Sequence, residues 1–197
     1  MNRKMFGAVA LIFGLFPASL FAGTVPIWGT GFETGLGGEW SSSSSNFSVV
    51  NSSLAFEGTH YLNVIGPSGT GGDTLSLPTP SVGYDTLSFE GQRRIYAGLE
   101  STDRLSIQWK VDGLDWQTPV IFSGLPVGDW SPFLFNLPAE ASDNPTLTFR
   151  WLAEFDGAND RALLDNLSLS GQPVPEPATL GLLVLGALTG ARRYHRG

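Results

Sequence analysis

The chain has 197 residues, of which 15% are charged, and its formal net charge at pH 7 is −7. This acidic balance disfavours nucleic acids and anionic membrane surfaces as partners, because both repel a negatively charged protein. The sequence contains no cysteine, which excludes disulfide bonds and thiol chemistry. The fold must therefore be held by its hydrophobic core, with or without help from a metal ion.

The first 22 residues have the layout of a secretory signal peptide. Arg3 and Lys4 form a basic start, residues 6–15 are almost wholly apolar, and residues 17–22 are a break followed by small residues. The alternative is a buried N-terminal helix, which Pro17 disfavours because proline breaks helices. We expect cleavage after Ala22 and export from the cytoplasm.

Residues 23–172 are long enough for a single domain with its own core. Only six basic residues lie between residues 23 and 174, against 17 acidic ones, so this part of the chain carries a net charge of −11. Such a surface favours solubility and the binding of cations.

The same region alternates apolar and polar residues with a period of two, which is typical of strands with one buried face. In Leu105–Val111, for example, Ser106, Gln108 and Lys110 should face outward. Further strands are expected at 47–50, 60–65, 75–77, 86–90, 95–99, 119–122, 133–137, 147–151 and 163–169, and the serine run 41–45 should be an exposed loop. Many short strands separated by turn residues predict an all-β fold, a single β-sandwich of the jelly-roll type.

Six tryptophans raise the question of sugar binding, since pyranose rings stack on flat aromatic faces. Trp109 and Trp151 lie on the apolar phase of their strands and are expected in the core. Trp116 and Trp130 each follow an aspartate at a turn. These two are therefore the better candidates for exposed platforms that bind a glycan.

The chain ends in three features that follow one another closely. Pro175, Glu176 and Pro177 form a short motif, residues 178–191 are apolar or small, and Arg192 and Arg193 begin a basic end. A membrane-spanning helix needs about 20 residues, whereas this run has 14. We therefore expect at most transient anchoring in the membrane.

This arrangement resembles the PEP-CTERM sorting signal of exported bacterial proteins. The resemblance covers residues 173–197 and implies that the motif, a short hydrophobic sorting helix and the basic tail are read by exosortase, a membrane-embedded enzyme, after passage through the secretion machinery. It also implies transient inner-membrane anchoring and delivery to the cell envelope or extracellular matrix. The alternatives are an ordinary tail anchor and a GPI signal, although a GPI tail would not normally end in three arginines.

The middle of the chain carries a second resemblance. The stretches GFE at 31–33, EGTHYL at 57–62 and LDNLSL at 164–169 are similar to concanavalin-like jelly rolls in carbohydrate-binding modules and adhesion domains. In that group the first and last strands lie side by side, and a glutamate and an aspartate ligate a structural calcium ion. Glu33 and Asp165 match these ligands, and backbone carbonyls at 57–60 would complete the six to eight oxygens that calcium takes. The alternative is that both are turn residues that accept hydrogen bonds from backbone amides.

The sequence gives little support for catalysis. Motifs of serine hydrolases, zinc proteases and phosphate-binding loops are missing, and His60 is the one histidine outside the tail. The pairs Asp112 with Asp115 and Asp156 with Asp160 fall in turns, where acids commonly bond to the backbone. We therefore expect a non-catalytic envelope or matrix protein with a structural or adhesive β-sandwich. The alternative is a carbohydrate-binding module with polysaccharide as its partner, and a glycan-active enzyme is the third choice.

Overall fold

The computed structural model describes residues 23–97 and 99–174, so the predicted signal peptide and the sorting signal from Pro175 onward lie outside the described residues. No helix in the described part of the chain is long and apolar enough to cross a membrane. The described elements are eleven strands and one 3-10 turn: β1 Val25–Thr30, β2 Ser41–Ser42, β3 Phe47–Asn51, β4 His60–Ile65, β5 Asp73–Pro78, β6 Tyr84–Ala97, β7 Arg104–Lys110, β8 Gln117–Phe122, β9 Ser131–Asn136, η1 Ala139–Ala141, β10 Thr148–Glu154 and β11 Arg161–Pro173.

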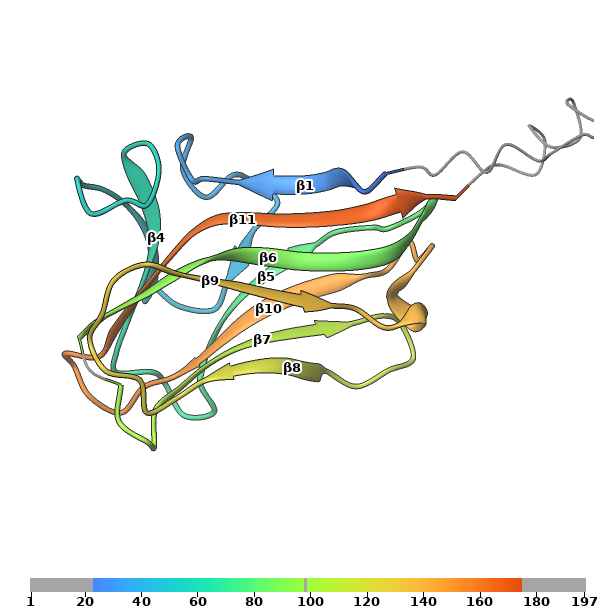
Figure 1. The fold of residues 1–197 in the computed structure, drawn as a ribbon. Helices are drawn as coiled ribbons and strands as arrows, with labels where there is room; N and C mark the ends of the chain where they lie inside the picture. Colours follow the sequence, from blue (N-terminus) through green and yellow to red (C-terminus); the bar gives the residue numbers. More distant parts are fainter. Residues whose placement is uncertain (1–22, 98, 175–197) are drawn as a thin grey trace, which may run out of the picture.

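The strands form two antiparallel sheets that pack face to face (Figure 1). Sheet A has the order β3-β4-β11-β6-β9, with β1 also paired to β11, and sheet B has the order β2-β5-β10-β7-β8. The prediction of an all-β sandwich is confirmed. Part of the serine run differs from expectation, because Ser41 and Ser42 pair with β5 and extend sheet B at its edge.

The first and last strands of the domain lie side by side. Along the same edge, β11 pairs first with β4, through Arg161–Leu164, and then with β1, through residues 167–171. The pairing of β11 with β6 is irregular between Asp165 and Ser168, and Asn166 has a φ of 47°. Asp165 thus lies where the pairing of β11 passes from the start of β4 to the end of β1.

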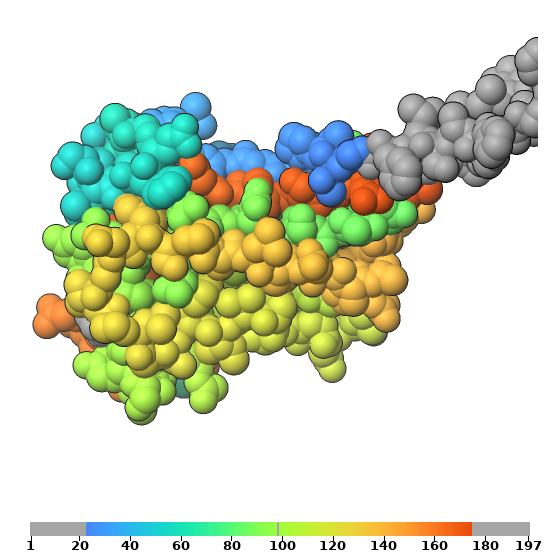
Figure 2. Space-filling model, in the orientation of Figure 1, coloured from blue at the N-terminus to red at the C-terminus, as the bar shows by residue number. Residues whose placement is uncertain are grey.

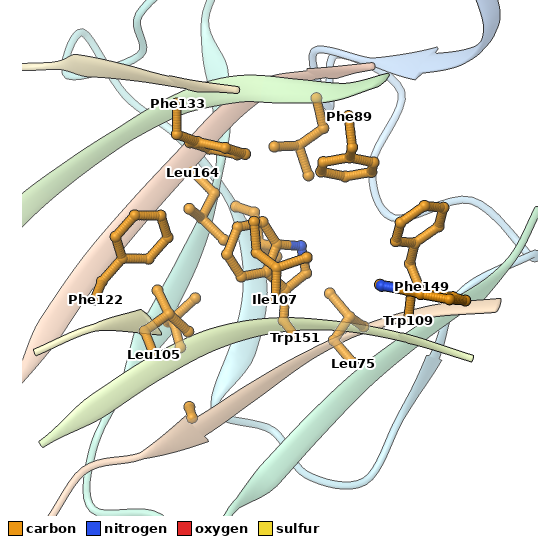
Figure 3. Close-up of a cluster of buried hydrophobic side chains, with 14 of the residues drawn as sticks. Leu75, Phe89, Leu105, Ile107, Trp109, Phe122, Phe133, Phe149, Trp151 and Leu164 are labelled. Atoms are coloured by element: carbon orange, nitrogen blue, oxygen red, sulfur yellow. The ribbon is translucent and has the colours of Figure 1, made fainter. Parts of the chain in front are cut away.

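The hydrophobic core lies between the sheets and is built from alternate residues of facing strands (Figure 3). Trp109 and Trp151 are buried there, as predicted, with 4% and 2% of their surface exposed. Phe89 of sheet A lies 4.7 Å from Phe149 of sheet B, and Phe133 meets Trp151 edge-on at 5.8 Å between ring centroids. Such aromatic pairs contribute about 0.5–1.5 kcal/mol beyond the burial of their area, and they join the two sheets.

The predicted strands at 86–90 and 95–99 form one long strand, β6. The alternation of buried and exposed residues in β6 continues through Gly91, which is on the buried side. A Cβ atom at this position would lie only 2.8 Å from the ring of Phe133, so no larger residue fits without a shift. The inward phase also includes Arg93, whose guanidinium carbon lies 4.7 Å from the ring centroid of Phe122 in sheet B. A single arginine is thus turned toward the facing sheet.

Candidate functional site

Asp165 anchors the connection between β3 and β4, residues 52–59. Its side chain is fully buried, and Oδ2 accepts hydrogen bonds from the N–H groups of Phe56 and Glu57 at 2.9 and 3.3 Å. Oδ1 accepts from the N–H of Asn166 at 2.8 Å. Burial raises the pKa of Asp165 above its usual range, although these backbone hydrogen bonds act in the opposite direction.

Glu33 holds the same connection from a second side. Its Oε1 accepts hydrogen bonds from the N–H groups of Thr59 and His60 at 2.8 and 2.9 Å, and its Oε2 accepts from Thr59 Oγ1 at 3.0 Å. The hydrogen bond from the His60 N–H, followed by that from Thr59, lowers the pKa of Glu33 to about 2. In Figure 2 this connection belongs to the teal lobe at one end of the molecule, away from the start of β1.

The structure therefore brings the two predicted calcium ligands, Glu33 and Asp165, onto one loop. Glu57 adds a carboxylate there and accepts a hydrogen bond from Asn166 Nδ2 at 2.7 Å, so the set offers the oxygen donors that calcium prefers. The contacts present are nevertheless those of the backbone-bonding alternative. Two donors already engage each oxygen of Glu33, which is the usual capacity of a carboxylate oxygen. Calcium at this loop stays a prediction.

His60 has partners at both ring nitrogens. Nδ1 lies 2.9 Å from Thr59 Oγ1 and 3.1 Å from Glu33 Oε2, and Nε2 lies 3.1 Å from Asn51 Nδ2. A general base needs a nitrogen directed at a substrate proton. The imidazole instead fastens the loop to the ends of β3 and β4.

Four carboxylates gather at the connections before β7 and before β11. Glu100, Asp103, Asp156 and Asp160 each place one oxygen within 4.8 Å of the others, and Asp103 and Asp160 are buried. The sequence analysis noted Asp156 and Asp160 as turn residues but did not bring them to Glu100 and Asp103. No local signal in the sequence shows this approach, because the pairing of β7 with β10 sets it.

The surroundings of this cluster shift the pKa values of three of its carboxyl groups, Glu100, Asp103 and Asp160. Burial raises the pKa of Asp160, and the negative charges of Asp103 and Asp156 add to the effect. The hydrogen bond with the Asp103 side chain raises the pKa of Glu100. Burial acts to raise the pKa of Asp103 as well, but hydrogen bonds from the Asp156 N–H and from Glu100 outweigh it and lower the pKa. Glu100 and Asp160 are therefore protonated at a higher pH than isolated carboxyl groups, and Asp103 at a lower one.

A row of polar side chains crosses the outer face of sheet B. Arg150 Nε donates to Gln108 Oε1 at 2.6 Å, and Gln108 Nε2 donates to Thr118 Oγ1 at 2.8 Å. The strand register sets Arg150 directly between Gln108 on β7 and Ser76 on β5. Gln108 faces away from the core, as its alternation predicted, yet its neighbours leave only 8% of it exposed.

Trp116, a predicted glycan platform, lies against this row. The guanidinium carbon of Arg150 is 4.0 Å from its ring centroid, and Lys110 Nζ is 5.0 Å away. The indole is half-buried, so part of it remains open to solvent. The sequence analysis identified Trp116 but not Arg150 and Lys110 beside it. The contacts arise because the β7–β8 connection lies over the outer face of sheet B, and the sequence does not show this.

Trp130, the other predicted platform, has a different place. Its Nε1–H donates to the carbonyl of Leu54 at 3.0 Å, and its ring meets Phe56 edge-on at 5.9 Å between centroids. Trp130 thus supports the β3–β4 connection rather than joining Trp116. The two tryptophans do not form one surface, since Trp116 lies against the outer face of sheet B and Trp130 contacts the β3–β4 connection.

Comparisons with known proteins bear on both parts of the chain. Residues 173–196 match the PEP-CTERM protein-sorting motif, which confirms the first resemblance. The motif implies export and a cell-surface or extracellular location. A search of curated proteins gives no match.

The described domain is similar to solved carbohydrate-binding and adhesin domains. The CBM22-1 xylan-binding domain of Paenibacillus barcinonensis Xyn10C has a TM-score of 0.54 at 15% identity, covering 77% of this chain and 97% of that one. TmCBM61, solved in complex with β-1,4-galactotriose, has a TM-score of 0.54 at 16% identity, with 73% and 95% covered. The K3 adhesin domain of Lys-gingipain from Porphyromonas gingivalis W83 has a TM-score of 0.56 at 12% identity, with 75% and 99% covered. At these identities the similarity shows the fold alone.

Proposed function

We propose that this protein is exported, processed by exosortase at its C-terminal end and displayed in the cell envelope or extracellular matrix, where its β-sandwich adheres to polysaccharide. The PEP-CTERM motif at residues 173–196 supports the sorting step. The fold is shared with a xylan-binding domain, with TmCBM61, which was solved in complex with β-1,4-galactotriose, and with an adhesin domain. This similarity supports the binding role.

The observation that carries the binding role is the position of Trp116 beside the polar row of sheet B. A pyranose ring presents an apolar face that packs on an aromatic ring and hydroxyl groups that need hydrogen-bond partners. Trp116 offers the aromatic contact, while Gln108, Thr118 and Arg150 offer donors and acceptors across three neighbouring strands. An arrangement spread over a sheet face suits a polymer chain better than a small molecule.

Catalysis has less support than binding. In the Glu100 cluster Asp103 and Asp160 are buried and already accept hydrogen bonds from backbone N–H groups, whereas the two carboxyl groups of a glycosidase must face a substrate from either side of the scissile bond. His60 has both ring nitrogens engaged. The domain is therefore proposed as a binding module without a catalytic centre.

The sorting step is tested by mass spectrometry of the surface or secreted protein. Glu176→Ala, or neutral replacements of Arg192 and Arg193, should leave the folded domain intact and stop maturation, because the tail is read at the membrane and is not needed for the core. A wild-type surface form that still ends in Gly197 would rule out exosortase processing.

The binding role is tested by applying the full-length protein to a glycan array. Trp116→Ala should lose most of the binding because it removes the aromatic contact. Leu114→Ala is a matched control, since Leu114 lies in the same turn and is 45% exposed. Equal binding by the Trp116→Ala protein and the wild type would place any glycan site elsewhere.

A further inference from the structure

The basic residues of the described domain lie on aromatic rings rather than against carboxylates. Five of the six do so: Arg93 on Phe122, Arg94 and Arg161 on Tyr96, and Lys110 and Arg150 on Trp116. Over residues 23–97 and 99–174, the one contact within 4.0 Å between a cationic side chain and a carboxylate is that of His60 with Glu33. Acidic residues outnumber these six by almost three to one. The positive charges are thus left without an internal anion.

Two of these cations converge at the proposed glycan surface. Arg150 donates a hydrogen bond from Nε to Gln108. Within the described residues its two terminal nitrogens have no hydrogen-bond acceptor. Lys110 likewise makes no hydrogen bond through Nζ within that part of the chain and lies 5.0 Å from the Trp116 ring centroid. Burial alone lowers the pKa of Arg150, with no carboxylate acting against it. Within the described residues neither cation forms an ion pair with the acids nearest to it in sequence, which are Asp112 and Asp115 for Lys110 and Glu154 for Arg150.

We propose that the polysaccharide bound at this surface is acidic, with uronate carboxylates that pair with Arg150 and Lys110 while the sugar ring contacts Trp116. This inference rests on the proposed function. The planar guanidinium of Arg150 can donate two parallel hydrogen bonds to one carboxylate, which gives strength and direction. Gln108 already fixes Arg150 through Nε, so the terminal nitrogens are held in place before the ligand arrives.

The net negative charge of the domain makes binding of an acidic polysaccharide depend on the local contacts at Arg150 and Lys110. With a net charge of −11, most of the surface repels a polyanion, so non-specific attraction contributes little. At physiological ionic strength this repulsion is screened beyond about 8 Å. Short contacts at Arg150 and Lys110 then decide whether an acidic chain binds.

The experiment compares polygalacturonate with its fully methyl-esterified form, which has the same backbone without the charge. Alginate serves as a second uronate polymer, and xylan and galactan serve as neutral polymers. The full-length protein should bind one or both uronate polymers at least tenfold more tightly than the ester. Arg150→Gln should weaken that binding about tenfold or more, because it removes a charge-assisted contact, and Lys110→Gln should weaken it less. Arg104→Gln is the matched control, since Arg104 is an exposed cation of β7 that lies on no aromatic ring of the described domain.

The outcomes separate this inference from the proposed function. Equal affinity for the charged and esterified polymers, or binding to xylan or galactan alone, would overturn the acidic ligand and leave polysaccharide binding intact. Failure to bind any of these polymers would overturn both. If Arg150→Gln alters folding, as its circular dichroism would show, Lys110→Gln decides the question because Lys110 takes no part in the hydrogen-bonded row. If Arg104→Gln weakens binding as much as Lys110→Gln does, the loss reflects only the change in net charge. That outcome would refute the pairing of uronates with Arg150 and Lys110.

Discussion

Replacing Asp165 with alanine should release the β3–β4 connection. The change removes the acceptor for three N–H groups, those of Phe56, Glu57 and Asn166. An unsatisfied buried donor costs about 1–3 kcal/mol. These amides are only partly buried, and the change also removes a buried charge, so we expect a total loss of about 3 kcal/mol. For a domain of this size the corresponding fall in Tm is about 6 to 12 °C.

The assay is thermal unfolding of the full-length protein followed by circular dichroism, with amide hydrogen exchange as a local readout. Exchange should accelerate at Phe56 and Glu57 and change little in β7 and β10, because only the connection is released. Asp160→Ala is the matched control: it removes a buried carboxylate that accepts one backbone hydrogen bond, from Gly157, and it relieves repulsion. An Asp165→Ala protein that melts within a degree of the wild type would refute the reasoning.

The same samples test the calcium prediction. A ligand that binds only the folded state adds about 2.7 kcal/mol when its concentration is 100 times its Kd. Calcium after chelation should therefore raise the Tm of the wild type by several degrees and leave that of Asp165→Ala unchanged. If calcium has no effect on the wild type, hydrogen bonds alone hold the loop. If only Asp160→Ala loses the response, the ion binds at the Glu100 cluster.

Two further substitutions test other parts of the domain. Arg93→Met should raise the free energy of unfolding by about 1 kcal/mol, because the buried Nε of Arg93 has no hydrogen-bond partner among the residues that the structure describes. A less stable variant in urea denaturation would show that the contact with Phe122 outweighs this cost. Glu33→Gln tests the pKa of about 2. Since a lowered folded pKa stabilises the protein above the unfolded value, the wild type should lose stability between about pH 4.5 and pH 2, and the variant should lose less; parallel pH profiles would contradict this.

The sequence by itself determined the fold class, the core tryptophans and the C-terminal sorting motif, whereas the N-terminal signal peptide stays a prediction. Alternation with a period of two is a local property, and it places Trp109 and Trp151 on the buried side of their strands whatever the partner strands are. The PEP-CTERM motif is likewise read from consecutive residues, and the family match over residues 173–196 bears it out. The resemblance to jelly rolls also placed Glu33 and Asp165 near each other, and both hold the 52–59 connection.

Only the tertiary structure decided which side chains from distant segments meet. The acidic cluster depends on the approach of the loop at Glu100 to that at Asp160, and the surface around Trp116 depends on a register that sets Arg150 opposite Gln108. A shift of one residue in that register would turn Arg150 to the other face. Alternation alone would have put Arg93 on the inner face with Phe89 and Ile95, against the usual preference of a charge for solvent. Local patterns specify which face a residue occupies, whereas the contacts that make a site depend on strand order and register.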